Sequence, residues 1–265
     1  MHCYHLLLTI HPYNLTSLPQ LCTHFKPANM IIFKKAEALH RYITSLKQQN
    51  KTIGFVPTMG ALHRGHLSLI DACRKQCDIT VCSIFVNPTQ FNDPKDFEKY
   101  PVTIEQDILL LTQQHTDVLF LPAVQEIYPD GVHALAHYDL GEIENILEGK
   151  YRPNHFQGVA QVVDRLLHMV QPDTLFLGRK DYQQCMVINK LIELIQLPVQ
   201  ISIQPTMRED DGLAMSSRNV RLSTAGRKKA IALCQTLLYI KEHAFKKDLP
   251  SLTEEAKKKI ACCRL

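Results

Sequence analysis

Short apolar runs alternate with segments of helical periodicity along most of this chain, and this alternation constrains the fold more than any other feature. Strands are predicted over residues 30–33, 52–56, 79–86, 118–121, 174–177 and 199–203. Helices are predicted from His66 onward and over 36–49, 103–115, 158–170, 182–195 and 224–245. This order is typical of an α/β protein with a parallel sheet and helices on both faces. Ligands bind such sheets beyond the carboxyl ends of the strands, so the residues after each strand are the functional candidates.

The loop after the strand at 52–56 carries the strongest chemical signal. It reads PTMGALHRGH and places His63 and His66 at the start of the next helix. Gly60 and Gly65 let the backbone approach a ligand, and the free N–H groups of a helix N-terminus favour an anion. The spacing resembles a phosphate-binding loop, but His66 replaces the lysine, which argues against a Walker ATPase. Imidazoles aimed at phosphate could stabilise charge that develops during displacement at phosphorus.

Two further loops carry polar side chains directly after predicted strands. Asn87 and Gln90, in SIFVNPTQF, could hold a hydroxyl or a carboxylate, although Asn-Pro is also ordinary turn chemistry. Lys180, in FLGRKDYQQ, could neutralise a phosphate. Asp181 beside it could hold a ribose hydroxyl or a metal ion, or cap the following helix.

A fourth polar loop, DGLAMSSRN, follows the last predicted strand. Ser216, Ser217 and Arg218 suit a mobile clamp for phosphate oxygens, and a solvated loop is the alternative. Because the four loops end successive strands of one predicted sheet, we expect them to meet at its ligand edge.

Composition and charge exclude several other classes of protein. The 265 residues are 45% hydrophobic and 21% charged, which fits one large or two modest globular domains. A net charge of +4 is too small to indicate nucleic-acid binding, and no apolar run is long enough to span a membrane. Ten basic and four acidic residues fall in 225–265, which we interpret as a solvated helical surface. The nine cysteines form no CxxC pair, so we expect reduced thiols in a cytoplasmic protein.

The first 29 residues differ from the rest of the chain. Lys26 is their only charged side chain, and the apolar run at 6–10 is too short for a signal peptide. Patterned sequence begins at Met30. We therefore predict that residues 1–29 are an N-terminal extension, disordered or not native to the protein, whose deletion leaves activity intact.

Six segments taken together resemble the pantothenate synthetase (pantoate–β-alanine ligase) family of the HxGH nucleotidyltransferase superfamily. They are PTMGALHRGH, SIFVNPTQF, YPVT, RPNHFQGV, FLGRKDYQQ and REDDGLAMSSRN, and the resemblance covers about 30–222. It implies a Rossmann-like ATP- and pantoate-binding domain over 30–204 and a small α+β lid domain over 205–265. The lid looks shortened, because the family normally continues into another helix and a small sheet. Homodimers are usual in this family.

The resemblance also implies a reaction. Pantoate would attack the α-phosphorus of ATP to give pantoyl adenylate and pyrophosphate, and β-alanine would then give pantothenate and AMP for coenzyme A biosynthesis. ATP and Mg²⁺ would be the cofactors, with Mg²⁺ held mainly by the ATP phosphates and any protein ligand unknown. The expected partners are these small molecules, without nucleic acid or membrane.

The family's site residues match thirteen positions of this chain. The implied catalytic residues are His66, the first choice, then His63, Lys180, Arg218, Ser216 and Ser217. ATP binding is implied for Met59, His63, His66, Gly178, Lys180, Asp181, Ser216, Ser217 and Arg218. Pantoate binding is implied for Gln90 and Gln184, with Asn87 and Tyr100 nearby. Arg152 and His155 fall in a matching motif without an assigned role.

Four positions depart from the usual family pattern, namely Asn154, Gln161, Arg179 and Arg221.

Two alternative functions stay open. A nucleotidyltransferase that forms no amide would share the HxGH turn, although Gln90 and Gln184 fit the ligase better. A truncated, non-catalytic homologue that only binds nucleotide is favoured by the short C-terminus.

Overall fold

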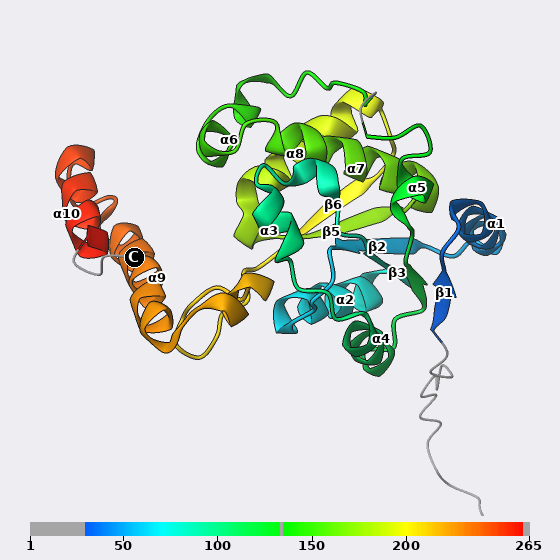
Figure 1. Ribbon diagram of the computed structural model, residues 1–265, viewed down its shortest axis with the longest axis horizontal. Coiled ribbons are helices and arrows are strands. Elements are labelled where there is room, and N and C mark those ends of the chain that lie inside the picture. The colour runs from blue at the N-terminus through cyan, green and yellow to red at the C-terminus, as the bar shows by residue number, and fades with distance from the viewer. Residues whose placement is uncertain (1–29, 133–134, 262–265) are drawn as a thin grey trace, which may run out of the picture.

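The computed structural model describes residues 30–132 and 135–261, so the predicted extension over 1–29 lies outside the described residues. Six strands form one sheet in the order β1-β4-β3-β2-β5-β6, and every pair of neighbours is parallel (Figure 1). The strands are β1 (Ile31–Phe33), β2 (Ile53–Thr58), β3 (Ile79–Ile84), β4 (Val118–Phe120), β5 (Thr174–Gly178) and β6 (Gln200–Gln204). The predicted α/β class and parallel sheet are confirmed.

Five long helices cover the sheet. They are α1 (Ala36–Lys47), α2 (Arg64–Gln76), α4 (Ile104–Gln113), α7 (His155–Val170) and α8 (Tyr182–Ile195). Helices α1, α7 and α8 lie on one face, and α2 and α4 lie on the other (Figure 1). The connections hold α3 (Pro94–Glu98), α5 (Val124–Ile127), α6 (Glu148–Tyr151) and the 3-10 turns η1 (Pro88–Gln90), η2 (Gly141–Glu144), η3 (Arg179–Asp181) and η4 (Ser217–Arg221).

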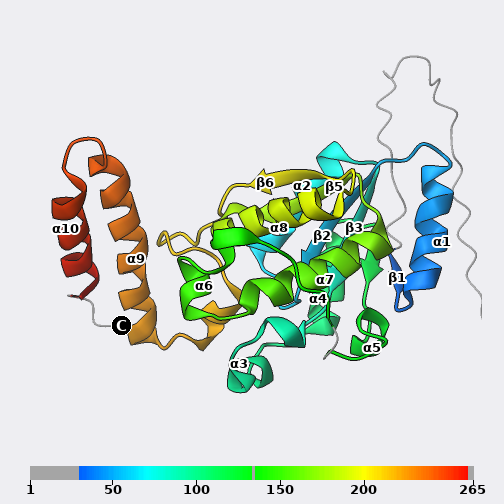
Figure 2. The same ribbon diagram turned by 90° about the horizontal axis from the view of Figure 1, so that it is seen from above.

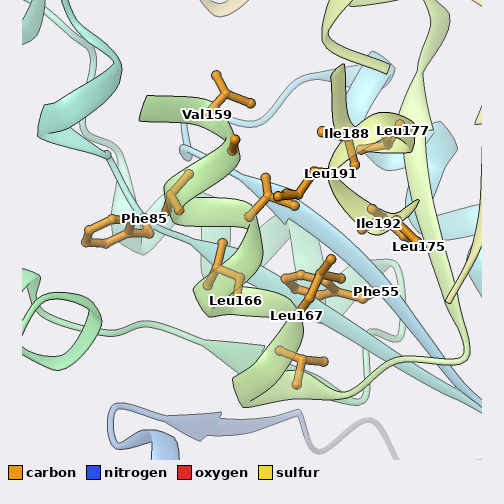
Figure 3. Close-up of a cluster of buried hydrophobic side chains, with 14 of the residues drawn as sticks. Phe55, Phe85, Val159, Leu166, Leu167, Leu175, Leu177, Ile188, Leu191 and Ile192 are labelled. Atoms are coloured by element: carbon orange, nitrogen blue, oxygen red, sulfur yellow. The ribbon is translucent and has the colours of Figure 1, made fainter. Parts of the chain in front are cut away.

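The apolar core has two layers because successive residues of a strand point to opposite faces of the sheet. Phe55 of β2 and Leu175 of β5 pack with Leu167 of α7 in the larger cluster (Figure 3). Val56 and Phe176, their next neighbours in sequence, pack on the other face against α2 and α4. All five side chains are fully buried. Burial on both faces explains why these strands read as continuous apolar runs.

Helix α7 begins at His155, three residues before the predicted start. Asn154 precedes it with a φ of 63°, a left-handed conformation that asparagine tolerates better than most residues. The turn before α7 is therefore left-handed at the asparagine that departs from the family pattern. Further along, a Cβ on Gly158 would lie 2.4 Å from the carbonyl oxygen of Thr89. Gly158 thus lets α7 approach η1, which carries Gln90.

The C-terminal part differs from the α+β lid that the sequence predicts. Helices α9 (Thr224–His243) and α10 (Leu249–Ala261) pair as a hairpin that lies away from the sheet (Figures 1 and 2). The β pairing described after β6 is one antiparallel bridge between Arg208 and Ala214. The described part of 205–265 is therefore mainly helical, because its alanine-, leucine- and lysine-rich segments are strong helix formers. Within the described ranges, no helix is long and apolar enough to cross a membrane.

Candidate active site

The loops after β2 and β5 meet at the point where the order of the sheet reverses. The chain continues from β2 to β3 on one side, while β5 pairs with the other edge of β2. Such a switch point opens a crevice between neighbouring loops. Here it forms a cavity of about 410 Å³. All thirteen predicted site residues line it: Met59, His63, His66, Asn87, Gln90, Tyr100, Gly178, Lys180, Asp181, Gln184, Ser216, Ser217 and Arg218.

The two histidines are fixed by the first turn of α2. His63 is the N-cap residue, and its Nδ1 accepts the N–H of Gly65 at 3.1 Å. The Nδ1 of His66 accepts the N–H of His63 at 3.3 Å. The ring centroids lie 4.0 Å apart. Because both Nδ1 atoms accept hydrogen bonds, each neutral ring carries its proton on Nε2. Each histidine therefore offers one N–H donor from the ring edge opposite the backbone.

Burial keeps both imidazoles neutral. Burial, together with the smaller effects of the neighbouring His63 and Lys180, lowers the pKa of His66 to about 3. Burial also lowers the pKa of His63, with Lys180 acting in the same direction. At neutral pH these groups are therefore hydrogen-bond donors without charge, and Lys180 supplies the positive charge beside them.

A buried carboxylate holds the histidine loop in place. Gly60 and Ala61 both have left-handed φ angles, of 82° and 48°. The Asp107 carboxylate of α4 accepts the N–H groups of Ala61 at 2.9 Å and Leu62 at 2.8 Å. Sequence reasoning missed this residue. A signal existed, since an aspartate at this position lies on the apolar face of α4, three residues after Ile104 and four before Leu111.

The loop after β5 presents a charged pair to the cavity. Lys180 Nζ lies 2.9 Å from an oxygen of Asp181. Asp181 is the residue before α8, yet its side chain makes no capping hydrogen bond. The capping alternative is therefore wrong, because this carboxylate pairs with Lys180 instead. A Cβ on Gly178 would meet no atom within 4 Å, so the backbone there borders open space.

The amides predicted to bind pantoate come from η1 and α8. Gln90 of η1 and Gln184 of α8 line the cavity from different elements. Asn87 caps η1, and its side-chain oxygen accepts the N–H of Thr89, so the turn chemistry expected of Asn-Pro is present. Asn87 is nevertheless buried beside the cavity. Arg152 and His155 hold the same turn, because each donates to the carbonyl oxygen of Gln90, at 3.4 and 2.8 Å.

The segment with Ser216, Ser217 and Arg218 closes the cavity from the C-terminal side. Ser217 Oγ donates to the carbonyl oxygen of Ala61 at 2.9 Å, which ties this segment to the histidine loop. Arg218 lies over the ring of Tyr100 and pairs with Asp96 of α3 at 2.8 Å.

A second arginine shares this carboxylate. Arg221 pairs with Asp96 at 2.8 Å, and the hydrogen bonds from Arg218 and then Arg221 lower the pKa of Asp96 to about 2. Arg221, which departs from the family pattern, thus fastens η4 to the body. Neither the role of Asp96 nor that of Arg221 is visible in the sequence, because their contact joins distant elements.

The cavity is lined by more cationic than anionic side chains. Its cationic side chains are Arg152, Lys180 and Arg218, and its carboxylates are Glu148 and Asp181. Across the residues that the structure describes, no three His, Cys, Asp or Glu side chains group closely enough to hold a metal ion. Together, the fold and the cavity define a parallel α/β protein with a polar cavity at its switch point.

Comparison with known proteins identifies the family to which this chain belongs. The pantoate–β-alanine ligase family profile matches residues 31–264. The pantothenate synthetase of Porphyromonas gingivalis is 49% identical over 208 residues, which cover 78% of this chain and 73% of that protein. That of Aquifex aeolicus is 45% identical over 208 residues, with the same coverage of 78% and 73%. The chain therefore belongs to the pantoate–β-alanine ligase family.

Solved structures agree with this placement. The crystal structure of pantothenate synthetase from Thermus thermophilus has a TM-score of 0.82 and 39% identity, covering 88% of this chain and 83% of that one. The pantoate–β-alanine ligase of Francisella tularensis, complexed with β-γ ATP and β-alanine, has a TM-score of 0.77 and 42% identity. That comparison covers 87% of this chain and 86% of the other.

Proposed function

We propose that this chain uses ATP to condense pantoate with β-alanine through a pantoyl-adenylate intermediate, giving pantothenate, AMP and pyrophosphate. One observation carries the proposal beyond family membership. The neutral histidines, Lys180 and the glutamines Gln90 and Gln184 line a single cavity. A nucleotide phosphate and a small hydroxy acid can therefore lie side by side there.

In the first step, a carboxylate oxygen of pantoate bonds to the α-phosphorus as the bond to the β-phosphate oxygen breaks. The Nε2–H groups of His63 and His66 donate to phosphate oxygens, where negative charge shifts during the displacement. Lys180 adds a full positive charge at the same edge of the sheet. Gln90 and Gln184 hold pantoate in line with phosphorus, which contributes through proximity.

Binding of ATP requires rearranged ion pairs. Lys180 is paired with Asp181, and Arg218 is paired with Asp96. Phosphate oxygens replace these carboxylates as partners of Lys180 and Arg218. Asp181 then becomes available to the ribose hydroxyls. Met59 and Gly178 lie beside the adenosine. Ser216, Ser217 and Arg218 close over the phosphates as part of a lid formed by 205–265 on an ATP- and pantoate-binding domain at 30–204.

In the second step, the amine nitrogen of β-alanine attacks the acyl carbon of the adenylate. AMP leaves with the bonding electrons, and the nitrogen loses a proton to give the amide. A free carboxylate is a poor acyl donor, which explains the need for adenylation. Water must be kept from the mixed anhydride, so closure of the segment with Ser216 to Arg218 protects the intermediate.

Three further properties belong to this proposal. Mg²⁺ neutralises phosphate charge when it is bound, and it is held mainly through ATP, with Asp181 as the nearby carboxylate. The protein is a homodimer, as is usual for the family, which light scattering after size exclusion would check. It is cytoplasmic, in agreement with free thiols at Cys73, Cys77, Cys82, Cys185 and Cys234.

The test is a reaction with ATP, pantoate and β-alanine, followed by separate measurement of AMP, pyrophosphate and amide. Formation of AMP and amide that requires both co-substrates supports the ligase. Release of pyrophosphate without an amide would instead show a nucleotidyltransferase. Intact ATP binding without any turnover would show a non-catalytic homologue.

A further inference from the structure

The side-chain amide of Asn87 is fully engaged within the protein. Asn87 is 1% exposed. Its Oδ1 accepts from Tyr128 Oη at 2.8 Å, from Thr89 Oγ1 at 3.1 Å and from Thr89 N at 3.3 Å. Its Nδ2 donates to the carbonyl oxygen of Gly158 at 3.1 Å and to Gln90 Oε1 at 3.2 Å. Both amide protons are therefore used, and Asn87 has none left for a ligand.

The neighbours of Asn87 permit one orientation of its amide. The N–H of Thr89 can only donate, and the carbonyl oxygen of Gly158 can only accept. A flipped Asn87 would place its NH₂ against that N–H and its oxygen against that carbonyl. Each mismatch would leave a buried polar group unsatisfied, at a cost of roughly 1–3 kcal/mol. Nδ2 therefore faces Gln90.

This orientation is passed on to Gln90. Since Asn87 Nδ2 donates, the atom of Gln90 that faces it is the acceptor Oε1. The other end of the Gln90 amide, Nε2, makes a 3.0 Å contact with Met59 Sδ, and a thioether is a weak acceptor. Gln90 lines the cavity, so it presents N–H donors to a ligand there. Such donors match the carboxylate and hydroxyl oxygens of a hydroxy acid.

Tyr128 makes the shortest of the bonds that hold Asn87. Its side chain is 2% exposed, and burial raises the pKa of its hydroxyl, which keeps the donated proton in place. The Arg165 guanidinium lies 5.2 Å from the centre of the Tyr128 ring and donates to the carbonyl oxygen of Ile127 at 2.9 Å. The hydroxyl is thus held by packing on α7, and Tyr128 is not among the residues that line the cavity.

We propose that Tyr128 is a positioning residue for the hydroxy-acid substrate, acting through Asn87 to present the Nε2 donors of Gln90 to the cavity. Asn87 is in turn a positioning residue rather than a direct ligand of pantoate. The substrate part of this inference rests on the proposed function, while the hydrogen-bond relay does not.

The kinetic test compares two tyrosine-to-phenylalanine variants of the full chain. Tyr128→Phe keeps the buried ring and removes the hydroxyl. We expect KM for pantoate to rise roughly five- to tenfold, the scale of one lost hydrogen bond, with KM for ATP unchanged. Tyr138→Phe is the matched control, because its hydroxyl donates to Asp164, outside the cavity, at 2.8 Å. Equal rises in both KM values, or no rise for pantoate, would overturn the proposal.

A second variant separates positioning from general weakening of the site. Tyr128→Phe added to Gln90→Ala should raise KM for pantoate no further, since the residue that it positions is gone. An additional rise of the same size would refute action through Gln90.

A spectroscopic measurement tests the relay without activity. In ¹⁵N–¹H spectra, the side-chain NH₂ signals of Asn87 and Gln90 should move in Tyr128→Phe and stay in place in Tyr138→Phe. Unmoved signals would overturn the relay. If the wild-type chain shows no pantoate-dependent release of pyrophosphate, the proposed function fails, and these spectra still decide the relay.

Discussion

Helices α7 and α9 show how differently the α/β body and the C-terminal hairpin use apolar residues. Helix α7 buries most of its length, including Phe156, Val163 and Leu167. Helix α9 is longer but buries only Ala230, Ala232, Cys234 and Thr236. On its surface Leu237 is 57% exposed and Leu238 is 60% exposed. Their sequences differ in the same direction, because the segment 225–265, which holds α9, carries ten basic and four acidic residues.

The difference lies in what each helix packs against. α7 packs on the sheet between its neighbours α1 and α8, where its side chains meet apolar partners on several sides. α9 contacts α10 and little else in the described chain, as their separation from the sheet shows (Figure 2). Stability and most of the candidate chemistry therefore belong to the body. The C-terminal region contributes to the candidate site through the segment before the hairpin, which carries Ser216 to Arg218.

The largest expected effect tests whether catalysis depends on the body. We predict that His66→Ala lowers the rate of pantoate-dependent pyrophosphate release at least ~10²-fold, because a transition-state donor is lost. Lys241→Ala, on the exposed surface of α9, is the control and should leave that rate unchanged. An unaltered rate in His66→Ala would remove this histidine from the mechanism.

A matched pair of leucine-to-alanine variants tests the contrast in packing. Leu167→Ala, where the side chain is 0% exposed, should lower the free energy of unfolding by ~2–5 kcal/mol. Leu238→Ala, where it is 60% exposed, should change it by less than ~0.5 kcal/mol. Urea denaturation measures both values. Similar losses in the two variants would mean that the hairpin surface is covered in solution.

Acid should lower the free energy of unfolding of the α/β body, because His66 resists protonation in the folded chain. Its pKa is about 3 in the folded chain, against an ordinary value of 6.5, so between these values the unfolded chain binds a proton that the folded chain excludes. The stability present above pH 6.5 is therefore lost as pH falls toward 3. We predict that this costs roughly 1–2 kcal/mol between pH 7 and pH 5. Urea titrations at both pH values should show a smaller loss in His66→Gln; an equal loss would assign the effect elsewhere.

The smallest effect is expected where the two regions meet. Asp96→Asn removes the carboxylate that pairs with Arg218, so Arg218 no longer has to break an ion pair to reach phosphate. KM for ATP should therefore fall roughly two- to threefold, a change in affinity typical of one exposed ion pair. Asp211→Asn frees Arg227 in the same way, outside the cavity, and should not change this KM. A higher KM in Asp96→Asn would mean that Asp96 positions Arg218 rather than competing for it.

Much of the body could be predicted from the sequence. All six strands lie where apolar runs indicate, and α8 has the predicted bounds, Tyr182–Ile195. The prediction for β2 ended at Val56, before a proline, whereas the strand continues to Thr58. Pro57 pairs with Ser83 of β3, while β5 pairs with β2 only at Gly54 and Phe55. Proline has no N–H to donate to a neighbouring strand. Pro57 is tolerated in β2 because β5 no longer pairs with β2 at that position.

The contacts that support the site could not be predicted from the sequence. Asp107 reaches the N–H of Ala61 across 46 positions, and Asp96 reaches Arg218 across 122. Tyr128 meets Asn87 across 41 positions. Nothing in local periodicity or motif spacing predicts which distant polar groups become neighbours.

The elements, their class and the motifs that end the strands follow from local sequence, because they depend on patterns within a few residues. How those motifs work together depends on the tertiary structure. The order of the strands brings the loops after β2 and β5 into one cavity, and burial keeps His63 and His66 neutral. Asp107 holds the histidine loop, and Tyr128 holds Asn87. Each of these depends on which surfaces meet when the sheet forms, and that is a property of packing across the whole chain.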